Sequence, residues 1–116
     1  MIRNRHNART NQIAHAISLI KERYSEKLNL DEIVQSVNMA PSSFYRNFKK
    51  VTQVSPLQYQ KQLRLNEAQR LMLSGEHSAE SASYLVGYES PTQFSREYKK
   101  MFGNPPKTDV KNLVAV

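Results

Sequence analysis

The sequence APSSFYRNFKKVTQVSP, residues 40–56, returns in altered form as SPTQFSREYKKMFGNPP, residues 90–106. At an offset of 50 residues, the two stretches are identical at six of their seventeen positions. The identical pairs are Pro41/Pro91, Phe44/Phe94, Arg46/Arg96, Lys49/Lys99, Lys50/Lys100 and Pro56/Pro106. A repeated segment indicates a repeated structural unit, and two copies are too few for a solenoid. The repeat therefore predicts a duplicated small module.

Both copies carry the signals of a helix that begins at its proline, over 41–52 and 91–102. Proline suits the first turn because the N–H that it lacks would have no partner there. At 100° per residue, the apolar side chains of each copy share one face and the arginine lies opposite. The expected buried residues are Phe44, Phe48 and Val51 in the first copy and Phe94, Tyr98 and Met101 in the second. A short helix, a tight turn and a helix with one basic face are typical of a helix-turn-helix.

The remaining segments also read as helices, because their apolar residues recur at helical spacing and none alternates like a strand. Asn29, Ser55 and Ser78 can cap helix starts, while Gly75 and Gly87 suit helix ends. These further helices are expected at 11–25, 30–37, 56–74, 79–86 and 108–113.

The expected fold is all-α, with about seven helices in two helix-turn-helix subdomains joined by a long central linker helix. The first subdomain is expected at 11–54, the linker helix at 55–75 and the second subdomain at 76–116. At about 1.5 Å per residue, the linker helix is roughly 28 Å long. That length is of the order of the ~34 Å between adjacent major-groove faces on one side of B-DNA. Residues 1–10 are expected to be a flexible basic arm or a linker remnant.

The composition favours an anionic partner. The net charge is +7, and the segment 40–75 contains six basic residues but one acidic residue, Glu67. Nucleic acid is the first partner to consider, before an anionic membrane surface or an acidic protein. The chain has no cysteine, no apolar run long enough to span a membrane and no signal-peptide pattern, which fits a cytoplasmic protein.

The outward faces of the two repeated helices are the candidate site, because the second helix of a helix-turn-helix presents this face to base edges. Arginine can grip guanine with two hydrogen bonds, and lysines one turn further along meet phosphates. The expected base-reading residues are Ser42, Ser43, Arg46, Thr92, Gln93 and Arg96. The expected phosphate contacts are Tyr45, Lys49, Lys50, Ser95, Lys99 and Lys100.

Several of these residues have a plainer interpretation. An isolated surface arginine usually pairs with a nearby acid, and it is the recurrence at equivalent positions that favours groove contact. Gln93 could equally complete a capping box, and Tyr45 and Ser95 fit either packing or phosphate contact. Arg64 is expected to tie the modules together rather than touch DNA.

The sequence resembles the DNA-binding domain of AraC/XylS-type transcriptional regulators over residues 11–110. The most specific match is VGYESPTQFSREYKKMFGNPP, residues 86–106, with PSSFYRNFKKVT at 41–52 and LRLNEAQRLML at 63–73. The resemblance implies a bacterial sequence-specific regulator, usually an activator that contacts RNA polymerase. It also implies an N-terminal effector-sensing domain that this sequence lacks, which favours a fragment.

The sequence departs from the family pattern at three places. Ala40 stands where a capping serine is common, and Gln53 replaces the usual glycine after the first repeated helix. Ala79 and Ala82 stand where larger aliphatic residues usually pack. These departures leave open which module binds more firmly.

Three other functions compete with a duplex DNA-binding regulator. A basic helical adaptor for a protein partner remains an alternative. An enzyme has little support, since the sequence shows no nucleophile–base pair, phosphate-cradling glycine loop, metal cluster or cofactor motif. Binding of single-stranded RNA is disfavoured because the aromatic residues of the repeats are expected to point inward.

Overall fold

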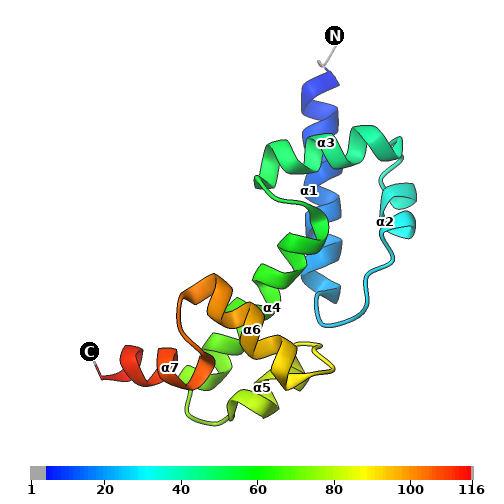
Figure 1. Ribbon diagram of the computed structural model, residues 1–116. Coiled ribbons are helices and arrows are strands. Elements are labelled where there is room, and N and C mark those ends of the chain that lie inside the picture. Colours follow the sequence, from blue (N-terminus) through cyan, green and yellow to red (C-terminus); the bar gives the residue numbers. More distant parts are fainter. Residues whose placement is uncertain (1–4, 116) are drawn as a thin grey trace. The chain divides into compact units, whose positions relative to one another are not determined.

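The computed structural model describes residues 5–115, with the side chains of residues 9–115, and forms an all-α fold. Its helices, labelled in Figure 1, are α1 (Arg5–Arg23), α2 (Leu30–Ser36), α3 (Pro41–Thr52), α4 (Pro56–Leu73), α5 (Ala79–Leu85), α6 (Pro91–Phe102) and α7 (Pro106–Val114). They divide into two compact units, Met1–Gln60 and Lys61–Val116, so the division falls within α4. The predicted fold class is confirmed.

The helix bounds agree closely with the sequence prediction for α3 and α6, which begin at their prolines and end where expected. The prediction for α1 was wrong at its start, because the helix begins at Arg5 rather than Asn11. Residues 5–10 lack apolar residues at helical spacing, but they also lack glycine and proline that would stop a helix. Part of the predicted basic arm is therefore helical, and residues 1–4 lie outside the described residues.

The first unit packs α1 against α2 and α3, with α3 lying across α1 (Figure 1). Its core consists of Ile13, Ala16, Ile20, Ile33, Val34, Val37, Phe44 and Phe48. The Phe48 ring meets the Tyr59 ring edge to face at 5.8 Å, which joins α3 to the first turn of α4. This packing holds α3 through its apolar face and leaves the opposite face free.

Two glutamine side chains tie loops to helices in this unit. The Gln12 amide on α1 donates to the Val37 carbonyl at 2.7 Å, where α2 ends. The buried Gln60 amide donates to the carbonyls of Tyr24 and Glu26 at 3.0 and 2.7 Å. These bonds give hydrogen-bond donors to carbonyls at or just beyond the ends of α1 and α2.

The second unit packs α5 and α7 against α6, and the part of α4 after Gln60 contributes residues to its core. Its core consists of Leu65, Ala68, Met72, Ala82, Val86, Tyr88, Phe94 and Tyr98. The Tyr98 hydroxyl donates to Asp109 Oδ2 at 2.5 Å, and the Gln69 amide donates to the same oxygen at 3.0 Å. A buried carboxylate with two donors thus joins α4, α6 and α7.

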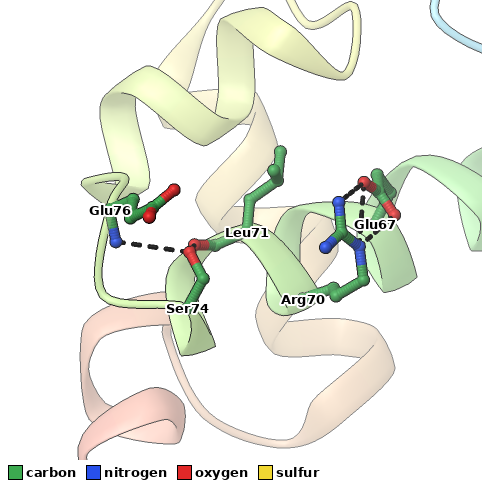
Figure 2. A network of polar contacts seen from close by, with 5 residues as sticks. All are labelled: Glu67, Arg70, Leu71, Ser74 and Glu76. Carbon is green, nitrogen blue, oxygen red and sulfur yellow. Dashed lines mark hydrogen bonds and ion pairs between the residues drawn. The ribbon is translucent and has the colours of Figure 1, made fainter.

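Hydrogen bonds and an ion pair between neighbouring residues lie at the C-terminal end of α4, as Figure 2 shows. The Arg70 guanidinium binds Glu67, with Nε 2.9 Å from Oε2, and this hydrogen bonding lowers the pKa of Glu67. The Ser74 hydroxyl donates to the Leu71 carbonyl at 2.6 Å and accepts from the Glu76 N–H at 3.3 Å. The chain then turns toward α5 through Gly75, whose φ of 80° suits glycine.

The two repeated helices differ in how they begin. The Ser90 hydroxyl accepts from the Gln93 N–H at 3.2 Å at the start of α6, whereas Ala40 gives α3 no side-chain cap. This difference is the one that the sequence predicted for Ala40. A missing cap costs a helix about 1 kcal/mol.

Their ends share one backbone conformation built from different residues. Gly103 ends α6 with a φ of 91°, and Gln53 ends α3 with a φ of 69°. A side chain in this left-handed region costs roughly 1–2 kcal/mol. The Gln53 amide returns one hydrogen bond to the Lys50 carbonyl at 3.0 Å.

One expectation about the buried faces was wrong. Phe44, Phe48, Phe94 and Tyr98 are buried, but Val51 is 48% exposed and Met101 is 39% exposed. These two residues lie in the last turn of their helices, at equivalent positions of the repeat. Helical angle alone predicted them inside, but a residue is buried only where a partner element reaches that turn.

Candidate nucleic-acid interface

The outward face of α3 carries the predicted residues of the first copy. Ser42, Arg46, Lys49 and Lys50 are exposed, and Tyr45 is exposed at the edge of the face. The Tyr45 ring meets Phe44 edge to face at 5.3 Å while its accessible part faces solvent. Its position therefore combines packing with access to a ligand.

Ser43 is partly buried, and a neighbour on the same helix holds it. The Asn47 amide donates to the Ser43 carbonyl at 2.7 Å and to the Ser43 hydroxyl oxygen at 3.2 Å. A hydroxyl has one proton and two acceptor positions. The Ser43 proton therefore stays free to donate to a ligand.

The outward face of α6 repeats this arrangement. Thr92, Gln93, Arg96, Lys99 and Lys100 are exposed, and Ser95 is partly buried. The structure thus places the predicted residues of each copy on one face of one helix. Each face presents an arginine with two lysines one turn further along, and we call this outward face of α3 and of α6 the reading face.

These cations differ from those of α4 in their partners. Among the described residues, the arginine and two lysines of each reading face have no carboxylate within 4.0 Å. On α4, Arg70 binds Glu67, Lys61 Nζ lies 3.7 Å from Glu97 Oε1, and the Arg64 guanidinium lies 5.5 Å from the centre of the Tyr88 ring. The α4 cations are therefore engaged within the second unit, and the reading-face cations remain available to an external anion.

One contact of Arg64 lies within the second unit. The guanidinium covers the Tyr88 ring in the segment that leads into α6. Such a cation–π contact contributes about 0.5–1 kcal/mol at a partly exposed position. Arg64 therefore helps to hold the turn that positions α6.

Gln93 does not form the second half of a capping box. Its side-chain Nε2 donates to Glu97 Oε2 at 2.9 Å, one turn further along α6. The spacing of four residues is visible in the sequence, but Glu97 was not among the predicted site residues. A capping box and an i,i+4 bond compete for the same amide, and the rotamer decides between them.

Glu97 is itself held by residues outside α6. Its Oε1 accepts from the Tyr88 hydroxyl at 3.0 Å, and the Lys61 ammonium lies 3.7 Å from the same oxygen. Burial, followed by the neighbouring Glu97 charge, raises the pKa of Tyr88 far above its usual range. The Tyr88 hydroxyl therefore stays protonated and donates at neutral pH.

Known proteins match both the sequence and the fold. A family model described as a helix-turn-helix domain matches residues 33–112. The lactose operon transcription activator of Staphylococcus xylosus is 31% identical over 78% of this chain and 32% of its own length. The HTH-type transcriptional regulator ArgR of Pseudomonas aeruginosa is 30% identical over 93% of this chain and 33% of its own length. The chain spans about a third of the length of these curated relatives.

Solved structures share the fold over most of the chain. An AraC-type transcriptional regulator from Chromobacterium violaceum has a TM-score of 0.80 and 26% identity, covering 88% of this chain and 91% of its own. The DNA-binding domain of AdpA, solved in complex with a target DNA, has a TM-score of 0.79 and 22% identity, covering 90% and 94%. Within residues 5–115, no helix combines the length and apolar character needed to span a bilayer. The matched helix-turn-helix family, the sequence relatives and the shared fold together show that the chain belongs to the AraC/XylS family of transcription regulators.

Proposed function

We propose that the chain binds double-stranded DNA selectively, with α3 and α6 each entering a major groove, and thereby regulates transcription. The observation that carries the proposal is the repeated set of exposed cations on these two helices, which have no carboxylate partner within the described part of the chain. A surface built only for solubility has no reason to repeat this set at equivalent positions. The family is one of regulators rather than enzymes.

The residue types assign a role to each part of the reading face. Arg46 and Arg96 suit guanine O6 and N7, which accept two hydrogen bonds from one guanidinium. Ser42 and Thr92 lie at the start of their helices, where backbone N–H groups and hydroxyls meet phosphates or base edges. The lysine pairs lie one turn further along and suit phosphates of the groove wall, so binding weakens as salt rises.

The two reading helices are proposed to contact two successive half-sites. Half-sites of helix-turn-helix proteins lie about 10 base pairs apart, one DNA turn. A spacing of the helices shorter than this turn would require bent DNA, at roughly 1–6 kcal/mol. The different residues at the starts of the helices, Ser42-Ser43 and Thr92-Gln93, would then give the half-sites different sequences.

The parent protein is proposed to be a bacterial cytoplasmic activator with an N-terminal effector-binding domain and contacts to RNA polymerase. Support comes from the relatives, since one is named as an operon activator and each is about three times as long as the matched segment. The effector-binding domain would control when the DNA-binding segment acts.

The proposal is tested by fluorescence anisotropy with an operator duplex and a scrambled duplex, at several salt concentrations. Arg46→Ala and Arg96→Ala should each weaken binding to the operator duplex by about 1–3 kcal/mol. Each change should also reduce the difference in affinity between the operator duplex and the scrambled duplex. Lys50→Ala should weaken binding to both duplexes and reduce the slope of log affinity against log salt concentration by about one. Arg70→Ala is the matched control, because Glu67 already binds that guanidinium. Equal affinity for both duplexes in the unchanged protein would refute the proposal.

A further inference from the structure

We propose that Glu97 determines the base preference of α6 by fixing the orientation of the Gln93 side-chain amide, so that Gln93 selects adenine. The inference rests on the proposed function, since it assumes that α6 lies in a major groove. It assigns a specificity role to a carboxylate that was not among the predicted DNA contacts.

Residues outside α6 hold the Glu97 side chain, and Glu97 in turn holds the side-chain amide of Gln93. The Glu97 side chain is 18% exposed, and its Oε1 accepts from the Tyr88 hydroxyl at 3.0 Å. Tyr88 is itself buried, its ring meets Phe94 edge to face at 5.4 Å, and Lys61 adds a charge on the same oxygen. Oε1 is therefore held from outside α6, and Oε2 is left for the exposed Gln93 amide at 2.9 Å.

The chemistry of the two groups decides which end of the amide faces outward. An ionised carboxylate only accepts hydrogen bonds, so the amide nitrogen rather than the oxygen must face Glu97. One N–H of Gln93 is then engaged, while the other N–H and the carbonyl oxygen have no partner among the described residues. A donor next to an acceptor in one amide plane matches adenine, whose N7 accepts and whose N6 donates.

The first copy shows an equivalent arrangement with different chemistry. Ser43 and Asn47 occupy the positions that correspond to Gln93 and Glu97 at the offset of 50 residues. There too, the residue one turn further along binds the predicted base reader, with Asn47 Nδ2 3.2 Å from the Ser43 hydroxyl oxygen. Because this recurs in the repeat, the i,i+4 pair is a feature of both reading helices.

A carboxylate beside the reading face also has a general electrostatic effect. Its negative charge repels phosphates whatever the base sequence, and so lowers affinity for all DNA. Replacing Glu97 by glutamine therefore removes this repulsion and frees the Gln93 amide to turn. Selectivity should fall while affinity for unrelated DNA stays the same or rises, whereas damage to the fold would lower both.

The test is selection of bound duplexes from a random pool with the unchanged protein and with Gln93→Ala, Glu97→Gln and Glu97→Ala. Gln93→Ala identifies the position that Gln93 reads, where the unchanged protein should prefer adenine. At that position, both Glu97 variants should reduce the adenine preference by about tenfold and leave the other positions unchanged. Glu76→Gln is the matched control, since it makes the same charge change in an exposed turn.

The outcomes separate the two proposals. If the unchanged protein enriches no motif, the proposed function itself fails. If it enriches a motif, the inference is overturned by any base other than adenine at the Gln93 position, by Gln93→Ala altering no position, or by an adenine preference within twofold of normal in both Glu97 variants. Glu97→Gln retains the size of the side chain, so its thermal melting curve shows whether the unit is still folded. A uniform loss at all positions would indicate a structural role and also refute the inference.

Discussion

The buried Tyr98–Asp109 hydrogen bond gives the sharpest prediction about stability. Tyr98→Phe removes only the hydroxyl, which donates to Asp109 Oδ2 at 2.5 Å in the core of the second unit. The ring contacts with Phe94 at 5.7 Å and Phe102 at 4.5 Å can remain. The change therefore isolates one hydrogen bond to a buried carboxylate.

Its magnitude follows from the surroundings of Asp109. A hydrogen bond to a charged group contributes about 1.5–3 kcal/mol, more than a neutral one. Asp109 is 9% exposed, and after the change only Gln69 still donates to Oδ2. We expect the free energy of unfolding to fall by about 2 kcal/mol, and the melting temperature by roughly 10 °C at 4–8 °C per kcal/mol.

Chemical denaturation followed by circular dichroism, together with thermal melts, measures this loss. Tyr84→Phe is the matched control, because the Tyr84 side chain is 52% exposed and its change should stay within about 0.5 kcal/mol. A loss below about 0.5 kcal/mol for Tyr98→Phe would refute the reasoning, since water would then replace the hydroxyl at no cost.

Three further predictions concern the helix ends and the response to high pH. Ala40→Ser should stabilise the protein by about 1 kcal/mol in denaturant titrations, because it adds an N-cap to α3. Ser90→Ala should destabilise it by a similar amount, because it removes the N-cap of α6. A lower free energy of unfolding for Ala40→Ser than for the unchanged protein would contradict this prediction. Gln53→Gly should stabilise the protein by about 0.5–1 kcal/mol, because Gln53 has a positive φ that glycine adopts without strain. Gly103→Ala should cost about 1 kcal/mol for the same reason, since nothing crowds Gly103 and only the backbone conformation opposes the change. Melting temperatures of the two variants equal to that of the unchanged protein would argue against this prediction. Burial and the bond to Asp109 raise the pKa of Tyr98, so its contribution to the free energy of unfolding is complete below the usual tyrosine pKa of about 10. At higher pH this contribution falls by up to about 1.4 kcal/mol per pH unit. Tyr98→Phe should remove this part of the pH dependence, and an unchanged slope of the free energy of unfolding against pH would contradict the prediction.

The sequence predicted the parts of the fold that depend on local signals. Pro41 and Pro91 mark helix starts because their ring suits the first turn, and α3 and α6 begin there. Asn38 follows α2 with a left-handed φ of 56°, a conformation that asparagine tolerates better than most residues. The start of α1 was missed because residues 5–10 continue the helix without an apolar face to reveal it.

Contacts between distant segments could not be predicted in the same way. Gln69 and Asp109 are 40 residues apart, and nothing in the local sequence indicates that they meet. Val51 and Met101 have the right helical angle for burial, but their exposure depends on where neighbouring elements end.

The reading face was predictable because the repeat marks it twice, but its internal bonds were not. The recurrence of Arg46 and Arg96 on exposed faces follows from helical periodicity alone. The choice of Gln93 to bind Glu97 rather than its own N-cap depends on a rotamer that the Tyr88 and Lys61 contacts help to fix. Sequence spacing allowed both bonds, and tertiary packing selected one.

The central claim is that one chain reads DNA with two equivalent helices. It is tested most directly by selecting duplexes with the unchanged protein, Arg46→Ala and Arg96→Ala from a pool randomised over about 20 base pairs, two half-sites long. We predict a motif with two conserved blocks whose centres lie about 10 base pairs apart, and each arginine change should erase guanine preference in a different block. A single block, or two blocks that both survive either change, would contradict the account.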